Sequence, residues 1–316
     1  MALLVIGRHE VVDKHYDEIC QQAPRRDVRL WPETGDRNDI EHALAWHPEP
    51  GELAKLPNLR TIVSVGAGVD HLFKDPALPN LPVIRYVDPD LTGRMVEYVT
   101  LNVLLHTRRM LEHRDHQAVQ NWVDLPAPAA HQVRVGIMGL GVLGSAAAVV
   151  LNALGYNVRG WTRCLRQAEN VLCFAGKEQL GVFLAETDIL VVLLPDTQDT
   201  HGMINRSLIQ QLSLRGRHPR LPGPILINAG RGGVQVEADI LAALDADELY
   251  AASLDVFETE PLPATSPLWN HPRVSITPHN AAVSMSENIA VYFLRHVERM
   301  ENGEPAENII DRSVGY

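Results

Sequence analysis

The stretch that decides the fold runs from Val133 to Gly144 and reads VRVGIMGLGVLG. An apolar run ends at Met138, and three glycines follow with the spacing Gly-x-Gly-x-x-Gly. Between a strand and a helix, the first glycine allows a tight turn, the second lets backbone approach a pyrophosphate, and the third packs helix on strand. Because the first amides of the following helix attract negative charge, the turn predicts a dinucleotide site. Its candidate cofactor residues are Gly139, Gly141, Val142, Leu143 and Gly144.

Short apolar runs, many of them β-branched, alternate with helical stretches on both sides of this turn. Such alternation is typical of parallel sheets covered by helices, and a doubly wound nucleotide-binding sheet needs about six strands. The strands expected from the turn onward are 133–138, 157–161, 189–194, 224–228, 250–255 and 274–277, and those before it are 3–7, 28–31, 43–46, 61–65 and 83–87. We therefore predict an α/β protein with two doubly wound parallel-sheet domains and a cleft between them.

One helix and a linker separate the two series of strands. Valines at helical spacing predict a helix from about Gly93 to about Glu112, and the proline-containing segment 121–131 is typical of a linker. A closing helix is expected from Ser284 to about Met300, from which the chain could return to the first domain. The expected domains are residues 1–95 with 286–316, for substrate, and residues 96–285, for the cofactor.

The bulk composition excludes several classes of protein. A formal net charge of -11 argues against a nucleic-acid surface, which needs a dominant basic face. The 3 cysteines form no Cys-x-x-Cys pair, so neither a disulfide framework nor a metal site is expected. The apolar start Met1–Gly7 lacks the features of a signal peptide, and no apolar run approaches the about 20 residues that span a bilayer. A cytoplasmic location, without a membrane partner, is the expectation.

The end of the strand at 157–161 bears on the choice of cofactor. An NAD-selective site usually has an acidic residue there, which binds the ribose 2′-hydroxyl. This chain instead has Trp161, Thr162 and Arg163, with Arg166 close behind. No carboxylate would repel a 2′-phosphate, and the hydroxyl and guanidinium groups could bind it. We therefore expect NADPH to be preferred, with NADH still possible.

Three polar residues follow successive strands of the second domain. Arg231 follows the strand at 224–228, Glu260 lies beyond the strand at 250–255, and His279 follows the strand at 274–277. Carboxyl ends of parallel strands gather at one edge of a sheet, so these side chains can converge. A cation that binds a carboxylate, an acid that donates a proton and a carboxylate beside that acid are what reduction of a 2-keto acid needs.

The segments around these three residues resemble signature segments of the D-isomer-specific 2-hydroxyacid dehydrogenase family. They are NAGRGG at 228–233, LDVFETEPL at 254–262 and TPH at 277–279. Further segments are similar to the glyoxylate/hydroxypyruvate reductase A branch: AWHP at 45–48, VGAGVD at 65–70, MVEY at 95–98, GIMG at 136–139 and LLP at 193–195. The resemblance covers essentially the whole chain. It implies a flavodoxin-like substrate domain, a Rossmann cofactor domain and reduction of glyoxylate or hydroxypyruvate to glycolate or D-glycerate by hydride transfer.

The resemblance also implies roles for single residues of the second domain. Arg231 would bind the keto acid, His279 would donate the proton and Glu260 would assist His279. Asp255 would lie near the nicotinamide carboxamide. The other candidate cofactor residues are Trp161, Thr162, Arg163, Leu194, Pro195, Ala229 and Gly230.

In the first domain, the resemblance implies substrate-binding residues. Backbone amides of Ala67 and Gly68 would hold the substrate carboxylate, and glycine there permits close approach. Trp46 would cap a small substrate. A homodimer is also implied, through the segment Leu111–Pro128.

Two alternatives stay open at this point. One is a non-catalytic dinucleotide-sensing protein related to corepressors. The presence of Arg231, Glu260 and His279 argues against it. The other is a D-2-hydroxyacid dehydrogenase for another 2-keto acid. A phosphoglycerate dehydrogenase is not favoured because no regulatory domain is expected after residue 316, nor is formate oxidation, because that branch has Gln in place of Glu260. The basic segment 213–224 is longer than the family's usual turn, and the sequence suggests no role for it.

Overall fold

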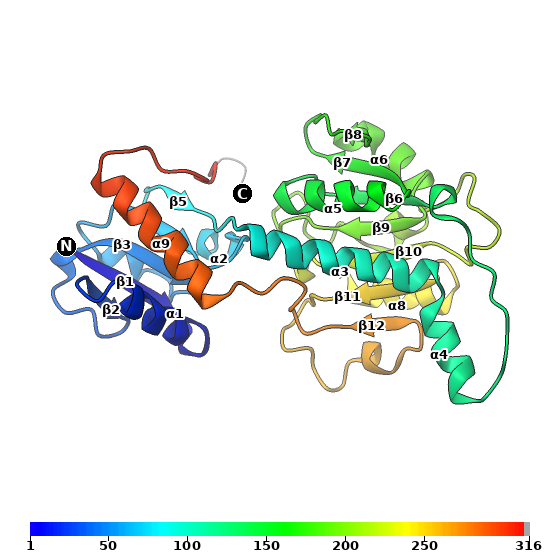
Figure 1. Cartoon of the computed structure of the whole chain (residues 1–316), viewed down its shortest axis with the longest axis horizontal. Helices are drawn as coiled ribbons and strands as arrows, with labels where there is room; N and C mark the ends of the chain where they lie inside the picture. The colour runs from blue at the N-terminus through cyan, green and yellow to red at the C-terminus, as the bar shows by residue number, and fades with distance from the viewer. Residues whose placement is uncertain (313–316) are drawn as a thin grey trace. The chain divides into compact units, whose positions relative to one another are not determined.

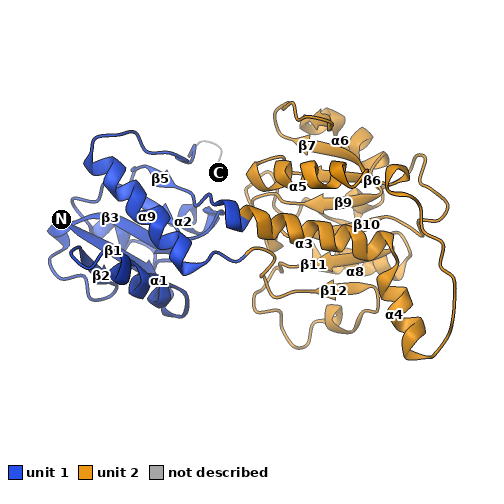
Figure 2. Ribbon diagram, in the orientation of Figure 1, with its two compact units in different colours: residues 1–91, 283–316 blue, residues 92–282 orange. Residues whose placement is uncertain are grey.

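The computed structural model describes residues 1–312, which form two compact units (Figure 2). Unit 1 comprises residues 1–91 with the C-terminal segment from Val283, and unit 2 comprises residues 92–282. The boundaries expected from the sequence, after residues 95 and 285, lie a few residues further along the chain. The chain leaves unit 1 within a helix and returns to it just before the last helix. The separate roles expected for the two units, substrate binding and cofactor binding, remain a prediction.

Unit 1 is built on a parallel sheet with the strand order β2-β1-β3-β4-β5. This is the flavodoxin-like order, in which the chain switches direction between β1 and β3. Helices α1 and α9 pack against each other beside the sheet (Figure 1). The strands are β1 (Ala2–Gly7), β2 (Asp27–Leu30), β3 (Ile40–Trp46), β4 (Thr61–Ser64) and β5 (Val83–Ile84), and the helices are α1 (His9–Gln22), α2 (Asp70–Phe73) and α9 (Ser286–Glu301).

Unit 2 is built on a seven-stranded parallel sheet with the order β12-β11-β10-β9-β6-β7-β8. This is the Rossmann order with one more strand, and its switch point lies between β6 and β9. The strands are β6 (Arg134–Met138), β7 (Asn157–Thr162), β8 (Leu172–Ala175), β9 (Ile189–Val192), β10 (Ile225–Asn228), β11 (Ala251–Leu254) and β12 (Val274–Ile276). The helices are α3 (Pro89–Thr107, begun in unit 1), α4 (Met110–Ala118), α5 (Val142–Ala153), α6 (Gly176–Ala185), α7 (Arg206–Ile209) and α8 (Glu237–Asp245). The α/β class and the two parallel sheets predicted from the sequence are confirmed.

Helices cover both faces of the sheet in unit 2. Ile189 and Val191 of β9 pack in a cluster with residues of α3 and α5, whereas Leu190 and Val192 pack with residues of α6 and α8 (Figure 1). All four side chains are fully buried. A continuous apolar run is what a strand buried on both faces requires, because its side chains alternate between two apolar layers.

The helix expected over 93–112 differs from the structure at both ends. Helix α3 starts at Pro89, because the Asp88 carboxylate accepts hydrogen bonds from the amides of Asp90 and Leu91 and so caps it. It ends at Thr107, and Arg109 adopts a left-handed conformation with φ of +54° before α4 begins. Arginine gives no sequence signal for such a break.

The strand β8 was not expected from the sequence. It is short, half-buried and at the sheet edge. Strand β5 is also shorter than the expected 83–87. The segment 121–129 has no helix or strand, in agreement with the predicted linker. Within residues 1–312, no helix is long and apolar enough to cross a membrane.

Candidate active site

The glycine turn predicted from the sequence lies between β6 and α5. Gly139 has φ of +102°, and a Cβ added to Gly144 would overlap the Gly139 carbonyl oxygen, so both positions require glycine. Around a Cβ added to Gly141, by contrast, residues 1–312 leave the space within 4 Å open. The N-terminus of α5 has no side-chain cap and no acidic residue in its first turn. Its amides and the open space beside Gly141 therefore fit the pyrophosphate of a dinucleotide.

The residues after β7 form the ribose end of this candidate site. Arg163 is exposed, and the Thr162 hydroxyl donates to the Cys164 carbonyl at 2.6 Å. Arg166 donates to the Leu140 carbonyl in the glycine turn at 3.1 Å. Two guanidinium groups therefore belong to this loop, one of them fixed to the glycine turn. The cation set expected for a 2′-phosphate is present.

Two expected cofactor residues have side chains that point into the core. Trp161 is 6% exposed and donates its indole N–H to the Gly176 carbonyl at 2.8 Å, and Leu194 is 7% exposed. Side chains alternate across a strand, and at Trp161 this alternation directs the indole inward. A contact of these two residues with a cofactor would therefore be made by their backbone, and it remains a prediction.

The loops after β6, β9 and β10 lie in close contact at the carboxyl edge of the sheet. A Cβ added to Gly139 would be 2.8 Å from the Leu193 carbonyl oxygen, and one added to Gly230 would be 2.7 Å from that of Leu194. Pro195 and Ala229 belong to the same two loops. Small residues at these positions let three backbone segments meet at the switch point, where ligands bind in open α/β sheets.

Arg231 is positioned by a buried asparagine at the end of β10. The Asn228 side chain accepts from the Gly230 amide at 3.0 Å, and donates to the Arg231 carbonyl at 3.3 Å and to Gln235 Oε1 at 2.8 Å. Gly232 follows with no room for a Cβ against the Phe257 carbonyl. The half-buried Arg231 guanidinium donates to the Gly230 carbonyl at 2.8 Å. Its cation is thus held at the edge of the sheet on a rigid loop.

Glu260 and His279 form a hydrogen-bonded pair, as the sequence predicts. His279 Nδ1 lies 2.7 Å from Glu260 Oε2, and Glu260 Oε1 accepts from the Phe257 amide at 3.0 Å. Since Nδ1 faces the carboxylate, Nε2 is the nitrogen that can transfer a proton. The His279 side chain is 44% exposed and the Glu260 side chain is 35% exposed, so a substrate can reach the imidazole.

The pKa of Glu260 indicates that Arg231 belongs to the same site. Burial alone would raise the pKa of Glu260, but hydrogen bonds from His279 and from the Phe257 amide, with the positive charges of His279 and Arg231, lower it overall. Glu260 is therefore ionised over the whole neutral range. The sequence predicts three catalytic groups: the carboxylate of Glu260, the imidazole of His279 and the guanidinium of Arg231. The positive charge of Arg231 acts on the carboxylate of Glu260.

Asp255 is buried and holds the turn that carries His279. Its carboxylate accepts from Thr277 Oγ1 at 2.6 Å and from the amides of Asn280 and Ala281 at 3.0 Å each, and its carbonyl accepts from the His279 amide at 2.8 Å. His279 has φ of +53°, an uncommon conformation for histidine that this set of bonds maintains. The structure thus gives Asp255 a structural function, and its place beside a nicotinamide remains a prediction.

In unit 1, the candidate substrate residues lie at the end of β3 and on the loop after β4. Trp46 ends β3, and its indole ring lies 2.6 Å from a Cβ added to Gly66, so glycine is needed beneath it. Ala67 and Gly68 follow on the same loop, which Ser64 Oγ braces by donating to the Gly68 carbonyl at 3.3 Å. His71 of α2 contacts the Trp46 indole with ring centroids 4.7 Å apart. The structure thus packs Trp46 on Gly66, the residue that precedes Ala67 and Gly68.

Several supporting residues were not identified from the sequence. Asn228 holds the Arg231 loop, Thr277 binds Asp255, and His71 contacts Trp46. Asn228 and Thr277 lie within the segments that resemble the family, and that was the available signal. For His71 there was none, because a lone histidine on a short helix is most often structural. Among residues 1–312, no cluster of three or more His, Cys, Asp or Glu could hold a metal ion.

Comparison with known proteins identifies the family. Residues 100–281, more than half of the chain, match the family described as D-isomer specific 2-hydroxyacid dehydrogenase, NAD binding domain. The chain belongs to the D-isomer-specific 2-hydroxyacid dehydrogenase family. It is also 40% identical over 302 residues to a glyoxylate/hydroxypyruvate reductase A of Escherichia fergusonii, covering 93% of each chain. As a member of this family, the chain is an oxidoreductase with a Rossmann domain.

Solved structures of the family have the same fold. An NADPH-dependent glyoxylate/hydroxypyruvate reductase from Sinorhizobium meliloti, in complex with NADP and sulfate, has a TM-score of 0.92 at 41% identity, covering 100% of this chain and 99% of that chain. A probable 2-hydroxyacid dehydrogenase from Rhizobium etli, in complex with NADP, HEPES and L(+)-tartaric acid, has the same TM-score of 0.92 and identity of 41%. It also covers 100% of this chain and 99% of that chain.

Proposed function

We propose that this dehydrogenase reduces glyoxylate and hydroxypyruvate to glycolate and D-glycerate with NADPH. The observation that carries the proposal is the His279–Glu260 hydrogen bond of 2.7 Å beside Arg231, at the carboxyl edge of a Rossmann sheet. Its relative from Escherichia fergusonii has the name of such a reductase, and the Sinorhizobium meliloti relative is NADPH-dependent. A purely sensing role would need none of these three side chains in this arrangement.

The proposed reaction assigns one task to each residue of the set. NADPH, when bound at the glycine turn, supplies a hydride to the carbonyl carbon of the keto acid. Arg231 binds the substrate carboxylate and polarises the carbonyl, so that negative charge develops on its oxygen. His279 Nε2 gives its proton to that oxygen, which completes the hydroxyl group. Glu260 stabilises the protonated imidazole before the transfer and holds its orientation.

NADPH preference rests on the loop after β7. Arg163 and Arg166 supply guanidinium donors beside Thr162, where an NAD-selective site has a carboxylate. Charge-assisted hydrogen bonds to a 2′-phosphate would add affinity for NADPH that NADH lacks. NADH remains a weaker alternative.

Trp46, Ala67 and Gly68 are proposed to bind the substrate. The amides of Ala67 and Gly68 would hold its carboxylate, and the Trp46 indole would limit its size. Support comes from the packing of the indole on Gly66, the residue that precedes Ala67. Small 2-keto acids are the substrate class that fits.

A homodimer in the cytoplasm completes the proposal. Apolar side chains are exposed along α4 and the linker, among them Trp122 at 100% and Val119 at 71%. Exposed apolar residues concentrated on one segment are typical of an interface. Sedimentation velocity of the wild type and of a Val119→Asp variant tests this. We expect the wild type to sediment as a dimer and the variant as a monomer.

Loss of NADPH absorbance on addition of a keto acid tests the proposed function. We expect turnover with glyoxylate and hydroxypyruvate, weaker turnover with bulkier 2-keto acids, and faster rates with NADPH than with NADH. A panel of 2-keto acids with both cofactors distinguishes this from a dehydrogenase for another acid. NADPH binding without turnover on any acid would favour the dinucleotide-sensing alternative.

A further inference from the structure

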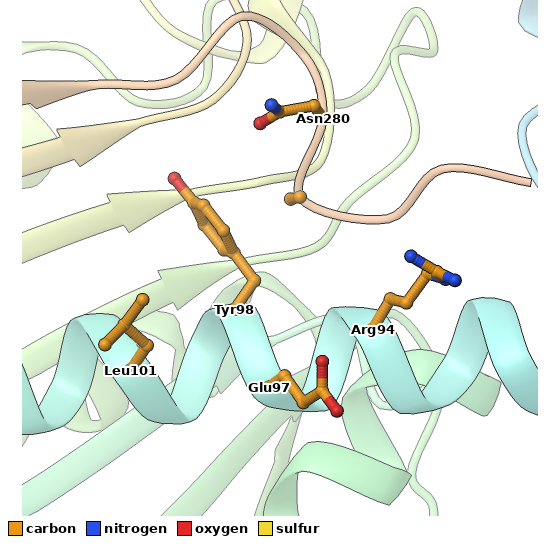
Figure 3. Close-up of a pocket in the computed structure, with 6 residues that line it drawn as sticks. Arg94, Glu97, Tyr98, Leu101 and Asn280 are labelled. Atoms are coloured by element: carbon orange, nitrogen blue, oxygen red, sulfur yellow. The ribbon is translucent and has the colours of Figure 1, made fainter.

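The bonds that hold the His279 turn extend to a tyrosine on α3. Tyr98 Oη lies 2.9 Å from Thr277 Oγ1, and Thr277 Oγ1 donates to Asp255 Oδ1 at 2.6 Å. All three residues belong to unit 2. Figure 3 shows the Tyr98 ring rising from α3 toward the loop that carries Asn280. A side chain of the covering helix is thus linked to the turn of the proton donor.

The direction of these hydrogen bonds follows from proton counting. A threonine hydroxyl has one proton, and here the carboxylate of Asp255 accepts it. Tyr98 must therefore donate its own proton to Thr277 Oγ1. Burial raises the pKa of Tyr98 to about 12, although the bond to Thr277 acts the other way, so the phenol keeps its proton at neutral pH. The chain of donors runs from Tyr98 through Thr277 to Asp255.

We propose that Tyr98 and Thr277 are positioning residues for the proton donor. Asp255 fixes the backbone amides of three successive residues, His279 to Ala281, and keeps His279 at φ of +53°. Thr277 and Tyr98 fix the carboxylate of Asp255 in turn. Successive hydrogen bonds polarise one another, so removing the outer hydroxyl weakens the inner bonds as well. This inference rests on the role of His279 in the proposed function.

A pocket beside Tyr98 allows the hydroxyl group to be removed by mutation without disturbing the packing of the ring. Tyr98, Asn280 and Ala281 line a pocket of about 330 Å³, together with Arg94, Glu97 and Leu101 (Figure 3). Its volume is open to solvent, so Tyr98→Phe removes one oxygen without forcing the ring to repack. Any effect on the reaction can then be assigned to the lost hydrogen bond.

The chain offers a matched control in a second tyrosine–threonine pair. Tyr156 Oη lies 2.8 Å from Thr107 Oγ1, also within unit 2, and burial raises the pKa of Tyr156 as it does that of Tyr98. Thr107 Oγ1 donates to the Val103 carbonyl at 2.8 Å, so Tyr156 donates to Thr107, and within residues 1–312 this pair has no hydrogen bond to the His279 turn. Tyr156→Phe therefore removes the same kind of bond and changes only stability.

Steady-state reduction of glyoxylate tests the positioning role. We expect kcat to fall about 3- to 10-fold in Tyr98→Phe, since one net neutral hydrogen bond corresponds to that range. In Thr277→Val, which breaks two bonds, the fall should reach about 10- to 100-fold. Affinity for NADPH and KM for glyoxylate should change less than kcat, and Thr277→Ser should recover most of the rate. Tyr156→Phe should keep the wild-type kcat.

A second readout needs no substrate and separates this inference from the proposed function. In spectra of ¹⁵N-histidine-labelled protein, the Nδ1 proton of His279 in its bond to Glu260 is identified by its loss in Glu260→Gln. We expect this signal to shift or broaden in Tyr98→Phe and Thr277→Val, and to stay in place in Tyr156→Phe. A wild type that reduces no 2-keto acid would defeat the proposed function alone. Equal kcat and unchanged histidine signals in Tyr98→Phe and Tyr156→Phe would overturn the positioning role.

Discussion

At the scale of single residues, the proposed chemistry depends on a carboxylate that stays ionised next to an imidazole. The lowered pKa of Glu260 keeps its carboxylate negative, and Glu260 Oε2 lies 2.7 Å from His279 Nδ1. Because the pKa of Glu260 is lower in the folded chain, its carboxylate contributes stability above its ordinary pKa and loses that contribution as the pH falls through the lowered value.

Glu260→Gln should move the pH dependence of the reaction. Reduction needs protonated His279, so kcat/KM falls as the pH rises, and removing the neighbouring negative charge should move this falling limb to lower pH. Oxidation of the hydroxy acid needs the neutral ring, and its rising limb should move the same way. Profiles of both directions with saturating cofactor check this. Superimposable limbs for the two proteins would mean that Glu260 only supports the Phe257 turn.

Arg163→Ala should weaken NADPH selectively. A charge-assisted hydrogen bond to the 2′-phosphate corresponds to about 10- to 100-fold in affinity, and NADH has no such group. Titration with both cofactors measures the ratio. Arg217→Ala, at an exposed arginine of the basic segment 213–224, controls for the change in net charge. Equal losses for the two cofactors in Arg163→Ala would contradict the assignment.

Trp46→Ala should change substrate selection. Removal of the indole opens space above Gly66, so KM for glyoxylate should rise about 10-fold and bulkier keto acids should become better substrates. NADPH affinity should stay unchanged. Trp269→Ala, which removes a half-exposed indole of unit 2, serves as the control. An unaltered substrate profile would return Trp46 to a packing role.

At the scale of elements, the glycine turn separates packing from ligand binding. Gly144→Ala should destabilise the fold by about 1–3 kcal/mol, because its Cβ would overlap the Gly139 carbonyl. Gly141→Ala should leave the melting temperature near that of the wild type, because the space around it is open. It should nevertheless weaken NADPH, since the methyl group would occupy the path of the pyrophosphate. Thermal unfolding and cofactor titration check both variants, and tight NADPH binding by Gly141→Ala would exclude the turn as the phosphate site.

Most of the strands that the sequence predicts are largely buried, although the predicted edge strands β2 and β12 are only half-buried. Strands such as β9, with four fully buried apolar residues, are recognisable from the run alone. Strand β8, which is half-buried at an edge, was not predicted. The break between α3 and α4 at Arg109 has no signal in the local sequence. The side-chain direction of Trp161 was also beyond the sequence, because position at a strand end does not say which face a residue takes.

At the scale of the whole molecule, two sheets of different strand order carry the candidate residues at their carboxyl edges. The segments around Arg231, Glu260 and His279 were predicted from the sequence because strand ends and family resemblance agree there. The hydrogen bonds from Asp255 through Thr277 to Tyr98 were not predicted, because they join residues that are distant in the sequence. Asp255 and Thr277 are 22 positions apart, and Tyr98 and Thr277 are 179 positions apart. Contacts of this kind follow from the packing of α3 on the sheet.

Single-turnover reduction of glyoxylate by NADPH-bound wild type and His279→Asn tests the central claim most directly. Asparagine tolerates the left-handed backbone at this position, so the turn should be kept and NADPH should bind as in the wild type. Loss of the proton donor should slow the reduction about 10²- to 10⁴-fold. Wild-type protein that fails to reduce glyoxylate and hydroxypyruvate, or a His279→Asn variant that reduces them at the wild-type rate, would contradict the account.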